Sequence, residues 1–279
     1  TPTWKDQHKE ATAFISSLER HVFPGIGQMP VDKIGSADVR AVMLAAREKA
    51  PFVAAKLSYR ISAVFNWAIT EQMRDDNPAT SLNLPKVRST GGHFRSLPYT
   101  EVAHCIGTVH SSGARQATKL AIEFTILTAA RSGEVRAATW DEIKGDVWRV
   151  PAERTKTGRE HAVPLSPRAL TILEEAKKLG SELIFPSPRG KVLSDMTLSK
   201  LVRELGFDAT VHGFRSSFRT WTQEQTNAPR EVAKAALAHV SGDKVERAYA
   251  RSDLFDKRAK LMDQWASYLD VRRGEVVAL

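Results

Sequence analysis

Side chains able to bind an anion and to move protons are spread through the second half of the chain, and a tyrosine follows them. They are Arg131, Lys156, His212, Arg215, His239 and Tyr249. Guanidinium groups offer planar forks of hydrogen-bond donors, imidazoles exchange protons near neutral pH, and a phenol becomes a nucleophile when a base or a cationic field removes or stabilises its proton. His212 and Arg215 are spaced to share one face of a helix.

Each of these side chains also has a purely structural interpretation. Arg131 is positioned to pair with Glu134, and Lys156 fits a solvated turn. His212 fits a helix cap, and Tyr249 fits a packing ring on an amphipathic helix. Taken one at a time, the structural interpretation is the favoured one, so any chemical role depends on the order and spacing of the whole set.

Several other kinds of site are absent from the sequence. We find no Gly-x-x-x-x-Gly-Lys-Ser/Thr loop for a triphosphate and no Gly-x-Gly-x-x-Gly after a predicted strand. The carboxylate pairs Asp75-Asp76 and Glu174-Glu175 are typical of surface charge rather than of a two-metal clamp. We therefore expect neither a metal site nor a nucleotide or other cofactor.

Composition predicts a folded, basic protein. The 279 residues include 41 Lys+Arg and 32 Asp+Glu, for a formal net charge of +9, with 42% hydrophobic and 26% charged residues. This balance is typical of globular proteins, and the excess of positive charge favours a polyanionic partner. No apolar run is long enough to cross a membrane. The single cysteine, Cys105, cannot form an internal disulfide, so we predict a reducing, cytoplasmic location.

Apolar residues recur at helical spacing through roughly the first 83 residues, which predicts a helical region with little strand. The first stripe comprises Phe14, Ile15, Leu18 and Val22. A second helix is expected to begin at Ser36, and a third covers residues 51–73. The third helix carries Lys56 and Arg60 four residues apart. Such a pair is usually a solvated face, but in a basic protein it also fits a phosphate backbone, so Lys56 and Arg60 are candidate DNA-binding residues.

A linker is predicted between the two parts of the chain. Residues 77–92 combine two prolines, paired glycines and two basic residues. We therefore expect two domains, residues 1–88 and residues 89–279.

Strand character is confined to the middle of the second domain. Residues 147–150 and 161–165 alternate in polarity on either side of a turn-rich segment, 155–158, which predicts a β-hairpin with Lys156 and Thr157 at its tip. An apolar helix over residues 118–128 is expected to end just before Arg131, and helices resume at Pro167. The predicted fold is therefore mainly α with a small β-hairpin or sheet.

Five motifs, taken in order, resemble those of the tyrosine recombinase (phage integrase) family. They are Thr128-Ala-Ala-Arg131-Ser-Gly-Glu134, Arg154-Thr-Lys156-Thr-Gly158, His212-Gly-Phe-Arg215, Leu237-Ala-His239-Val240 and Ala248-Tyr249-Ala-Arg251-Ser252. Residues 1–85 resemble the helical, SAM-like core-binding domain of that family, with its typical ending in Phe65-Asn66-Trp67-Ala68 and Asn77-Pro78-Ala79. The resemblance is nearest to the branch carried by satellite phages and genomic islands. Members of that branch usually have a further amino-terminal, arm-binding domain, which we expect to be missing from this sequence.

The resemblance implies how a DNA phosphate would be held and attacked. Tyr249 is the expected nucleophile, and Arg131 and Arg215 are expected to hold the scissile phosphate. Two guanidiniums can neutralise the non-bridging oxygens and favour the more highly charged pentacoordinate state, which a lysine could not match geometrically. The product is a 3′-phosphotyrosine, which conserves the energy of the phosphodiester bond.

The resemblance also implies how protons would move. Lys156 is the expected general acid for the departing 5′ oxygen, and a mobile hairpin tip would let it reach into the groove of the DNA. His212 and His239 are expected to assist, with His212 favoured as the base. Thr157, beside Lys156, is an expected DNA contact. Because cations of the protein supply the charge neutralisation, neither a metal ion nor ATP is expected.

The expected architecture is a two-domain clamp around double-stranded DNA, in which a core-binding domain precedes a catalytic domain. The activity implied is site-specific recombination between attachment sites, integrating or excising a mobile element, with DNA-bending accessory proteins as further partners. An apolar stripe follows Tyr249 and comprises Leu254, Phe255, Leu261, Met262, Trp265 and Leu269. It either packs on its own domain or, as the resemblance implies, docks on a neighbouring protomer in a homotetramer that exchanges C-terminal helices.

Two other functions remain open from the sequence. A DNA-binding or architectural protein that keeps the clamp but has lost catalysis is one, although the intact set of six side chains argues against it. A type IB topoisomerase is the other, because it uses the same chemistry. Relaxation of supercoiled DNA without an attachment site would favour the topoisomerase, whereas sequence-dependent joining of two sites would favour the recombinase.

Overall fold

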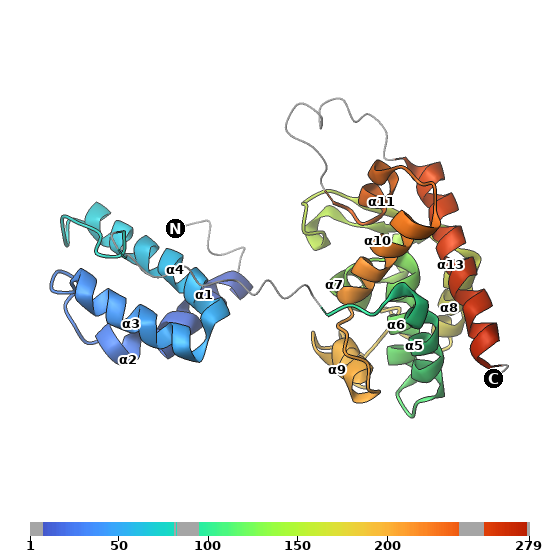
Figure 1. Cartoon of the computed structure of the whole chain (residues 1–279), viewed down its shortest axis with the longest axis horizontal. Coiled ribbons are helices and arrows are strands. Elements are labelled where there is room, and N and C mark those ends of the chain that lie inside the picture. The colour runs from blue at the N-terminus through green and yellow to red at the C-terminus, as the bar shows by residue number, and fades with distance from the viewer. Residues whose placement is uncertain (1–7, 81, 83–94, 240–253, 278–279) are drawn as a thin grey trace. The chain divides into compact units, whose positions relative to one another are not determined.

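The chain contains two compact units, Thr1–Gly91 and Gly92–Leu279, each with its own hydrophobic core (Figure 1). The computed structural model describes residues 8–80, 82, 95–239 and 254–277. The predicted boundary between residues 88 and 89 falls in the stretch 83–94, outside the described residues.

The first unit is helical over its described residues. Its helices are α1 (His8–His21), α2 (Phe23–Ile26), α3 (Ser36–Lys49) and α4 (Pro51–Thr70). The Asp38 side chain accepts a hydrogen bond from the Gly35 backbone N–H at 2.9 Å and so caps the start of α3. Pro51 occupies the first turn of α4, where a missing N–H leaves no helical bond unmade. Both helix starts are thus encoded locally.

The core of the first unit lies between α1, α3 and α4. Leu18 and Val22 of the predicted stripe are buried, whereas Ile15 is 52% exposed. The third helix ends at Thr70, three residues before its predicted end. Gln72, just beyond it, has a left-handed backbone with φ of 58°, which a continuing helix could not accommodate.

The second unit is mainly helical, as predicted, with one small sheet. Its helices are α5 (Tyr99–Ser111), α6 (Gln116–Thr128), α7 (Ser132–Arg136), α8 (Pro167–Lys177), α9 (Thr197–Glu204), α10 (Gly213–Gln225), α11 (Arg230–Ala236) and α13 (Phe255–Val277). Helix α6 is buried from Leu120 to Thr128 and forms the centre of the core. Its Phe124 ring contacts the rings of Trp148 and Phe185, with ring centroids 5.5 and 5.4 Å away. The sheet and the helices therefore share one core.

The sheet has three antiparallel strands in the order β1-β2-β3. They are β1 (Ile143–Lys144), β2 (Val147–Val150) and β3 (His161–Pro164). Strands β2 and β3 are the predicted hairpin, with Val150 opposite His161 at the end next to the turn. The short strand β1 and two 3-10 turns, η2 (Trp140–Glu142) and η3 (Ala152–Arg154), carry no strong sequence pattern and were not predicted.

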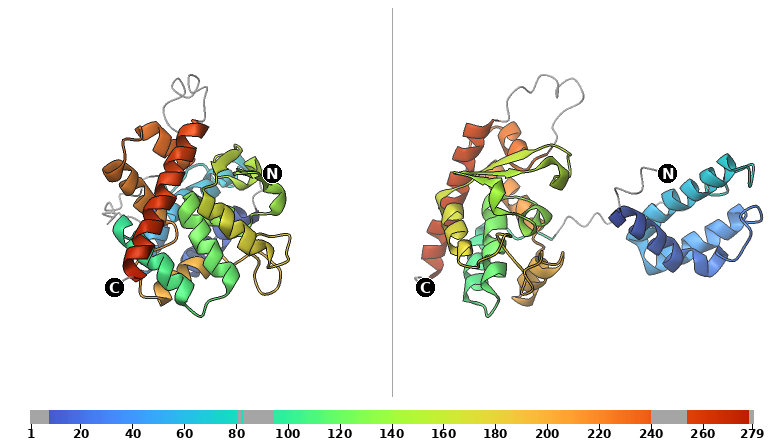
Figure 2. Two further views of the ribbon diagram at one scale, coloured as in Figure 1. Left: turned by 90° about the vertical axis from the view of Figure 1, so that its right-hand side faces the viewer. Right: turned by 180° about the vertical axis from the view of Figure 1, so that it is seen from behind.

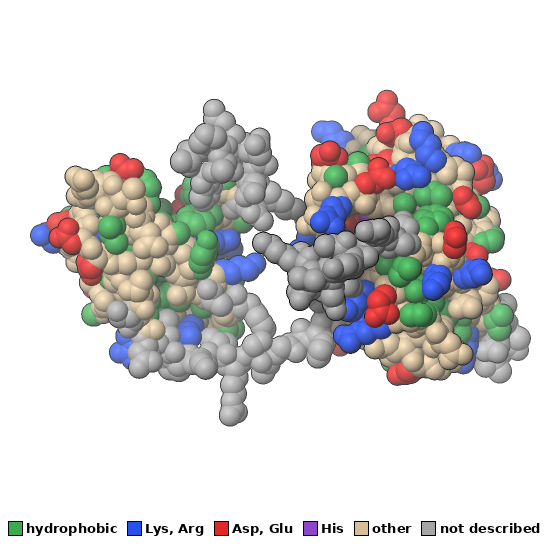
Figure 3. Space-filling model, turned by 90° about the horizontal axis from the view of Figure 1, so that it is seen from above, with side chains coloured by type: hydrophobic (Ala, Val, Ile, Leu, Met, Phe, Trp, Pro, Cys, Tyr) green, Lys and Arg blue, Asp and Glu red, His purple; other side chains and the backbone are tan. Residues whose placement is uncertain are grey.

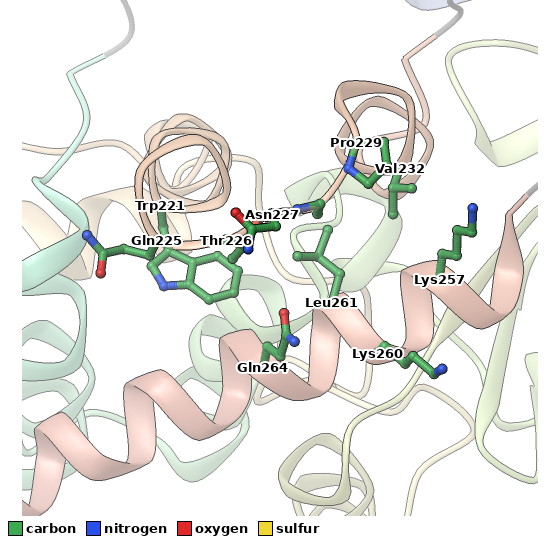
Figure 4. A pocket seen from close by; sticks show the side chains of 11 residues that line it. Trp221, Gln225, Thr226, Asn227, Pro229, Val232, Lys257, Lys260, Leu261 and Gln264 are labelled. Atoms are coloured by element: carbon green, nitrogen blue, oxygen red, sulfur yellow. Dashed lines mark hydrogen bonds between the residues drawn. The ribbon is translucent and has the colours of Figure 1, made fainter.

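Helix α13 packs along its own unit, beside α5, α11 and β3 (Figure 2). Leu261, Met262 and Leu269 are buried there, and the Trp265 indole N–H donates to the Ile126 carbonyl of α6 at 3.0 Å. Of the two alternatives for the apolar stripe, packing on its own domain is therefore the arrangement found. The groove between α13 and the connection from α10 to α11 stays open and is lined by Trp221, Pro229 and Leu261, among others (Figure 4).

The surface carries charges of both signs. Figure 3 shows Lys and Arg side chains interspersed with Asp and Glu on the face of the second unit that it presents. Among the described helices, none is both long and apolar enough to cross a membrane.

Candidate active site

Arg131 stands at the junction between α6 and α7, where a buried carboxylate orients it. Its guanidinium Nη1 donates to Glu134 Oε1 at 2.8 Å, and its backbone N–H donates to Glu134 Oε2 at 2.9 Å. Glu134 is only 3% exposed. The Arg131–Glu134 ion pair, which is the structural interpretation of Arg131, is therefore present. It fixes the direction of the guanidinium. A second donor, Nη2, lies 3.4 Å from the Ala238 carbonyl.

Arg215, in the first turn of α10, is buried and ties two other segments together. Its Nη1 donates to the Ala129 carbonyl beyond α6, and its Nη2 donates to the Leu237 carbonyl beyond α11 at 2.6 Å. Burial, followed by the charge of Arg131, lowers the pKa of Arg215 to about 10. The Arg215 guanidinium remains a cation at neutral pH, although the positive charge of Arg131 lies nearby.

The backbone at these junctions is turned in an unusual way. Ala129 and Ala238 both have left-handed conformations, with φ of 48° and 47°. Residues with a β-carbon rarely adopt such angles, and they persist where the surrounding structure holds them. Ala129 presents its carbonyl to Arg215, and Ala238 presents its carbonyl to Arg131.

Gly213 explains how α10 can start so close to the rest of the unit. A β-carbon at this position would lie 2.2 Å from the Arg95 carbonyl oxygen, a distance that no side chain tolerates. The glycine between His212 and Arg215 therefore permits the close approach that sets the start of α10.

His239 follows α11 and lies against the Arg215 guanidinium. Its Nε2 atom is 3.4 Å from Arg215 Nη2. Burial, then the charges of Arg215 and Arg131, lower the pKa of His239 to about 4. At neutral pH its imidazole is therefore uncharged and able to accept a proton or a hydrogen bond.

His212 and Lys156 belong to the same electrostatic environment. The pKa of His212 is lowered from its ordinary value by partial burial first, and then by the charges of Arg215, Arg131 and Lys156. Lys156 lies in the turn between η3 and β3, where its side chain is exposed. The predicted tip residue Thr157 is half-buried, with its hydroxyl 3.4 Å from that of Thr155.

The structure brings five of the six predicted side chains into one electrostatic cluster. They are Arg131, Lys156, His212, Arg215 and His239. Tyr249 lies in 240–253, outside the described residues. The predicted DNA contacts Lys56 and Arg60 belong to α4 of the first unit.

The two α4 candidates differ in how they are held. Lys56 is exposed. Arg60 instead donates from Nη1 to the Ala13 carbonyl at 2.9 Å and to the Ser17 hydroxyl at 2.5 Å, with its guanidinium 5.6 Å from the centre of the Phe14 ring. Arg60 therefore joins α4 to α1, and Lys56 is the better placed of the two for a phosphate.

Two residues near the cluster were not predicted from the sequence. His161, on β3, has its pKa lowered to about 4, by burial first and then by the charge of Arg258. Arg219, one turn beyond Arg215 on α10, contributes to the lowered pKa of His239. A histidine inside an alternating strand was the only signal for the first, and the four-residue spacing from Arg215 was the only signal for the second.

The arrangement fits an anion rather than a metal ion. Two guanidiniums and a lysine gather beside two imidazoles; the charge of Arg131 lowers the pKa of Arg215, and the cations lower the pKa of both imidazoles. A bound phosphate would relieve that repulsion. Among the described residues, no three His, Cys, Asp or Glu side chains are grouped to hold a metal ion. Cys105 is buried in α5, and burial raises the pKa of its thiol to about 12.

Known proteins match both units. The chain matches the phage integrase central domain over residues 1–84 and the phage integrase family over residues 95–254. The integrase of Enterobacteria phage P4 is 28% identical over 99% of this chain and 68% of its own length. Prophage integrase IntA of Escherichia coli is 32% identical over 90% of this chain and 62% of its own length. The chain thus spans about two thirds of the length of these two relatives.

A solved structure has the same fold. The lambda integrase tetramer bound to a Holliday junction superposes with a TM-score of 0.68 and 23% identity, over 85% of this chain and 74% of that chain. Together with the two family matches, which cover most of both units, the likeness means that this chain belongs to the phage integrase family, the tyrosine site-specific recombinases.

Proposed function

We propose that this chain cleaves and rejoins DNA strands through a covalent bond between Tyr249 and a 3′ phosphate. The observation that carries the proposal is the pair of arginines, Arg131 and Arg215, held by Glu134 and by the backbone carbonyls beyond α6 and α11 beside an uncharged His239. Such a pocket offers fixed donors to a phosphate before the substrate arrives, which is the form that electrostatic stabilisation of a transition state takes.

The side chains of the site can supply each proton transfer that strand cleavage requires. The Tyr249 oxygen forms a bond to phosphorus and gives its proton to an imidazole, while the bond from phosphorus to the 5′ oxygen breaks. Lys156 donates a proton to that departing oxygen, which leaves as a hydroxyl. Rejoining is the reverse, with the 5′ hydroxyl of a second strand as the nucleophile.

The lowered pKa values of the two histidines support a base rather than a fixed cation. A neutral imidazole can accept the phenol proton at neutral pH, and the negative charge of bound DNA would raise its affinity for that proton. His212 is the favoured base, because a bound phosphate would offset the charges of Arg215, Arg131 and Lys156 that lower the pKa of its free imidazole. His239, which lies against Arg215, is the favoured hydrogen-bond partner of the phosphate.

The proposed substrate is double-stranded DNA carrying an attachment site, gripped by both units as a clamp. The first unit would supply Lys56, and the second would supply Thr157 beside the catalytic lysine. Support comes from the net charge of +9 and from the phage and prophage relatives. The product would be an integrated or excised mobile element in bacterial cytoplasm, with DNA-bending proteins as accessory factors.

Assembly on DNA as a homotetramer is supported by the lambda integrase tetramer on a Holliday junction, which shares the fold. Exchange of C-terminal helices remains a prediction. Detaching α13 from its own unit would be costly, because Leu261, Met262 and Trp265 are nearly fully buried there. The exposed end of α13, where Val271 is 66% exposed, is the more accessible part for a neighbour.

The experiment uses a pool of nicked duplexes with a randomised core, in which cleavage releases a short fragment and traps the protein on DNA. Denaturing gels would separate the adduct, and sequencing the trapped DNA would identify the preferred site. We expect an adduct at a 3′ end with a defined core sequence. Binding without any adduct would favour a silent DNA-binding protein, and an adduct on every sequence would favour a topoisomerase.

A further inference from the structure

Lys156 is held in place indirectly, through the segment that leads to it. Ten residues, 151–160, separate β2 from β3, so this turn extends well beyond the sheet. The Lys156 side chain itself is exposed and makes no hydrogen bond or ion pair with the described residues. Where its ammonium group can reach therefore depends on how the backbone on either side of it is fixed.

The approach to Lys156 is anchored by a buried carboxylate. Glu142, in η2, is 8% exposed, and its Oε2 atom accepts two hydrogen bonds. One comes from the Trp148 indole N–H of β2 at 2.8 Å, and the other comes from Arg154 Nη2 at 2.7 Å. Trp148 is fully buried, so the carboxylate connects Arg154, two residues before the lysine, to the core of the unit.

The residue between Arg154 and the lysine closes the turn. Thr155 is 8% exposed, and its hydroxyl donates to the Ala152 carbonyl at 3.0 Å. The Arg159 backbone N–H donates to the same hydroxyl at 3.2 Å. Gly158 completes the turn with φ of 65°, an angle that favours glycine. The lysine therefore projects from a turn that is closed by hydrogen bonds.

Stability alone does not account for an arginine at position 154. Its Nε and Nη1 atoms are buried and have no partner among the described residues. Buried ion pairs with unused donors are often no more stable than apolar side chains of the same size, and their best attested use is to fix one geometry. What the Glu142–Arg154 pair fixes is the start of the turn that carries Lys156.

We propose that Glu142 and Arg154 are positioning residues for Lys156, which set the reach of its ammonium group to the departing 5′ oxygen. The proposal rests on the proposed function of Lys156 as the general acid. It predicts a defect limited to proton delivery, because the pair touches none of the groups that hold the phosphate. Those groups are held instead by Glu134 and the carbonyls of Ala129 and Leu237.

The test compares two versions of the trapped duplex, with oxygen or with sulfur as the bridging 5′ atom at the scissile phosphate. A sulfur leaving group needs no proton, because a thiol has a pKa near ~8.5 whereas an alcohol is far less acidic. We expect Glu142→Gln and Arg154→Lys to slow cleavage of the oxygen substrate by about tenfold or more, and to leave the sulfur substrate within about twofold of the unmodified protein.

A matched control lies on the same hairpin. Arg149 and Glu160 form an exposed ion pair between the flanks of the turn, with Arg149 Nη1 3.1 Å from Glu160 Oε1 and exposed fractions of 52% and 57%. Glu160→Gln removes that pair without touching the buried carboxylate. We expect it to cleave both substrates at the unmodified rate.

Lys156→Ala separates failure of this inference from failure of the proposed function. If Lys156→Ala is slow on oxygen and normal on sulfur while Glu142→Gln and Arg154→Lys are equally slow on both, the positioning role is overturned and the general acid stands. Normal cleavage of the oxygen substrate by both variants overturns it as well. If Lys156→Ala is equally slow on both substrates, Lys156 is not the acid, and the inference falls with that assignment. Should Glu142→Gln fail to fold, Arg154→Lys carries the test, because it keeps the charge and most of the aliphatic stem.

Discussion

The arginine pocket and the Lys156 turn hold their cations in opposite ways. Arg215 is 5% exposed and donates to the carbonyls of Ala129 and Leu237, so its direction is set by the ends of two helices. Lys156 is exposed, and the turn that carries it is anchored through Thr155 and the Glu142–Arg154 pair. The difference matches the two tasks, because charge stabilisation gains from fixed dipoles, whereas a proton donor must reach an atom that moves away.

The largest effect is expected from Arg215→Lys in the pocket. A compact ammonium group lacks the planar fork of donors that spans the two carbonyls and a phosphate, so cleavage should fall by about 10²–10³-fold. DNA binding should stay within about threefold, because many contacts share it. Adduct rates and gel-shift titrations measure the two quantities, with Arg149→Lys as an exposed control. Equal losses in both would mean that Arg215 only anchors DNA.

A smaller effect is expected from Glu134→Gln, which keeps the shape of the pocket but removes the charge that orients Arg131. Cleavage should fall by about tenfold to a hundredfold, since a small misplacement of a catalytic group has effects of that size. Glu174→Gln breaks an exposed pair of the same spacing, with Lys177, and should change nothing. Single-turnover cleavage is the readout, and an unchanged rate for Glu134→Gln would show that Arg131 orients itself.

His161 stands between the two regions, on β3 and within the field of Arg131, Arg258 and Glu134. Its pKa is about 4 in the folded protein, below the ordinary value of 6.5. Between those values the unfolded chain binds more protons, so stability is complete above pH ~6.5 and is lost as the pH falls.

The loss attributable to His161 should be about 2 kcal/mol between pH 7 and pH 5. His161→Asn should flatten the dependence of the unfolding free energy on pH, as measured by urea denaturation at the two pH values. Some dependence should remain from His239, whose pKa is lowered in the same direction. A variant with the full original slope would place the titrating group elsewhere.

The smallest effects are expected in α4, which also combines a hydrogen-bonded arginine, Arg60, with an exposed lysine, Lys56. Lys56→Ala should weaken DNA binding modestly and reduce the slope of log affinity against log salt by about 1. Arg60→Ala should instead lower the stability of the first unit by about 1 kcal/mol, because Arg60 bonds α1. Salt titrations and thermal melts distinguish the two, and reversed outcomes would exchange their roles.

Much of the site could be predicted from the sequence because its residue types and their order are specific. Arg131, Lys156, His212, Arg215 and His239 were all named in advance, and the structure gathers them into one cluster. The main helices and the β2–β3 hairpin were predicted too, because apolar spacing and turn residues encode them locally.

What could not be predicted depends on contacts between distant segments. The left-handed Ala129 and Ala238 present their carbonyls to Arg215 and Arg131, which meet them only when the ends of α6 and α11 come together. No sequence pattern predicts the hydrogen bond between Glu142 and Arg154, because the sheet brings η2 and the turn together. Neither could the exposure of Ile15 be foreseen, since its helical spacing matches that of the buried Leu18.

The central claim is that a phosphate held by Arg131 and Arg215 is attacked by Tyr249. The most direct measurement is covalent trapping by Tyr249→Phe on the nicked duplex selected by the unmodified protein. We predict that the variant binds this duplex with nearly unchanged affinity and forms no adduct on a denaturing gel. An adduct that survives the substitution would place the nucleophile on another residue and contradict the account.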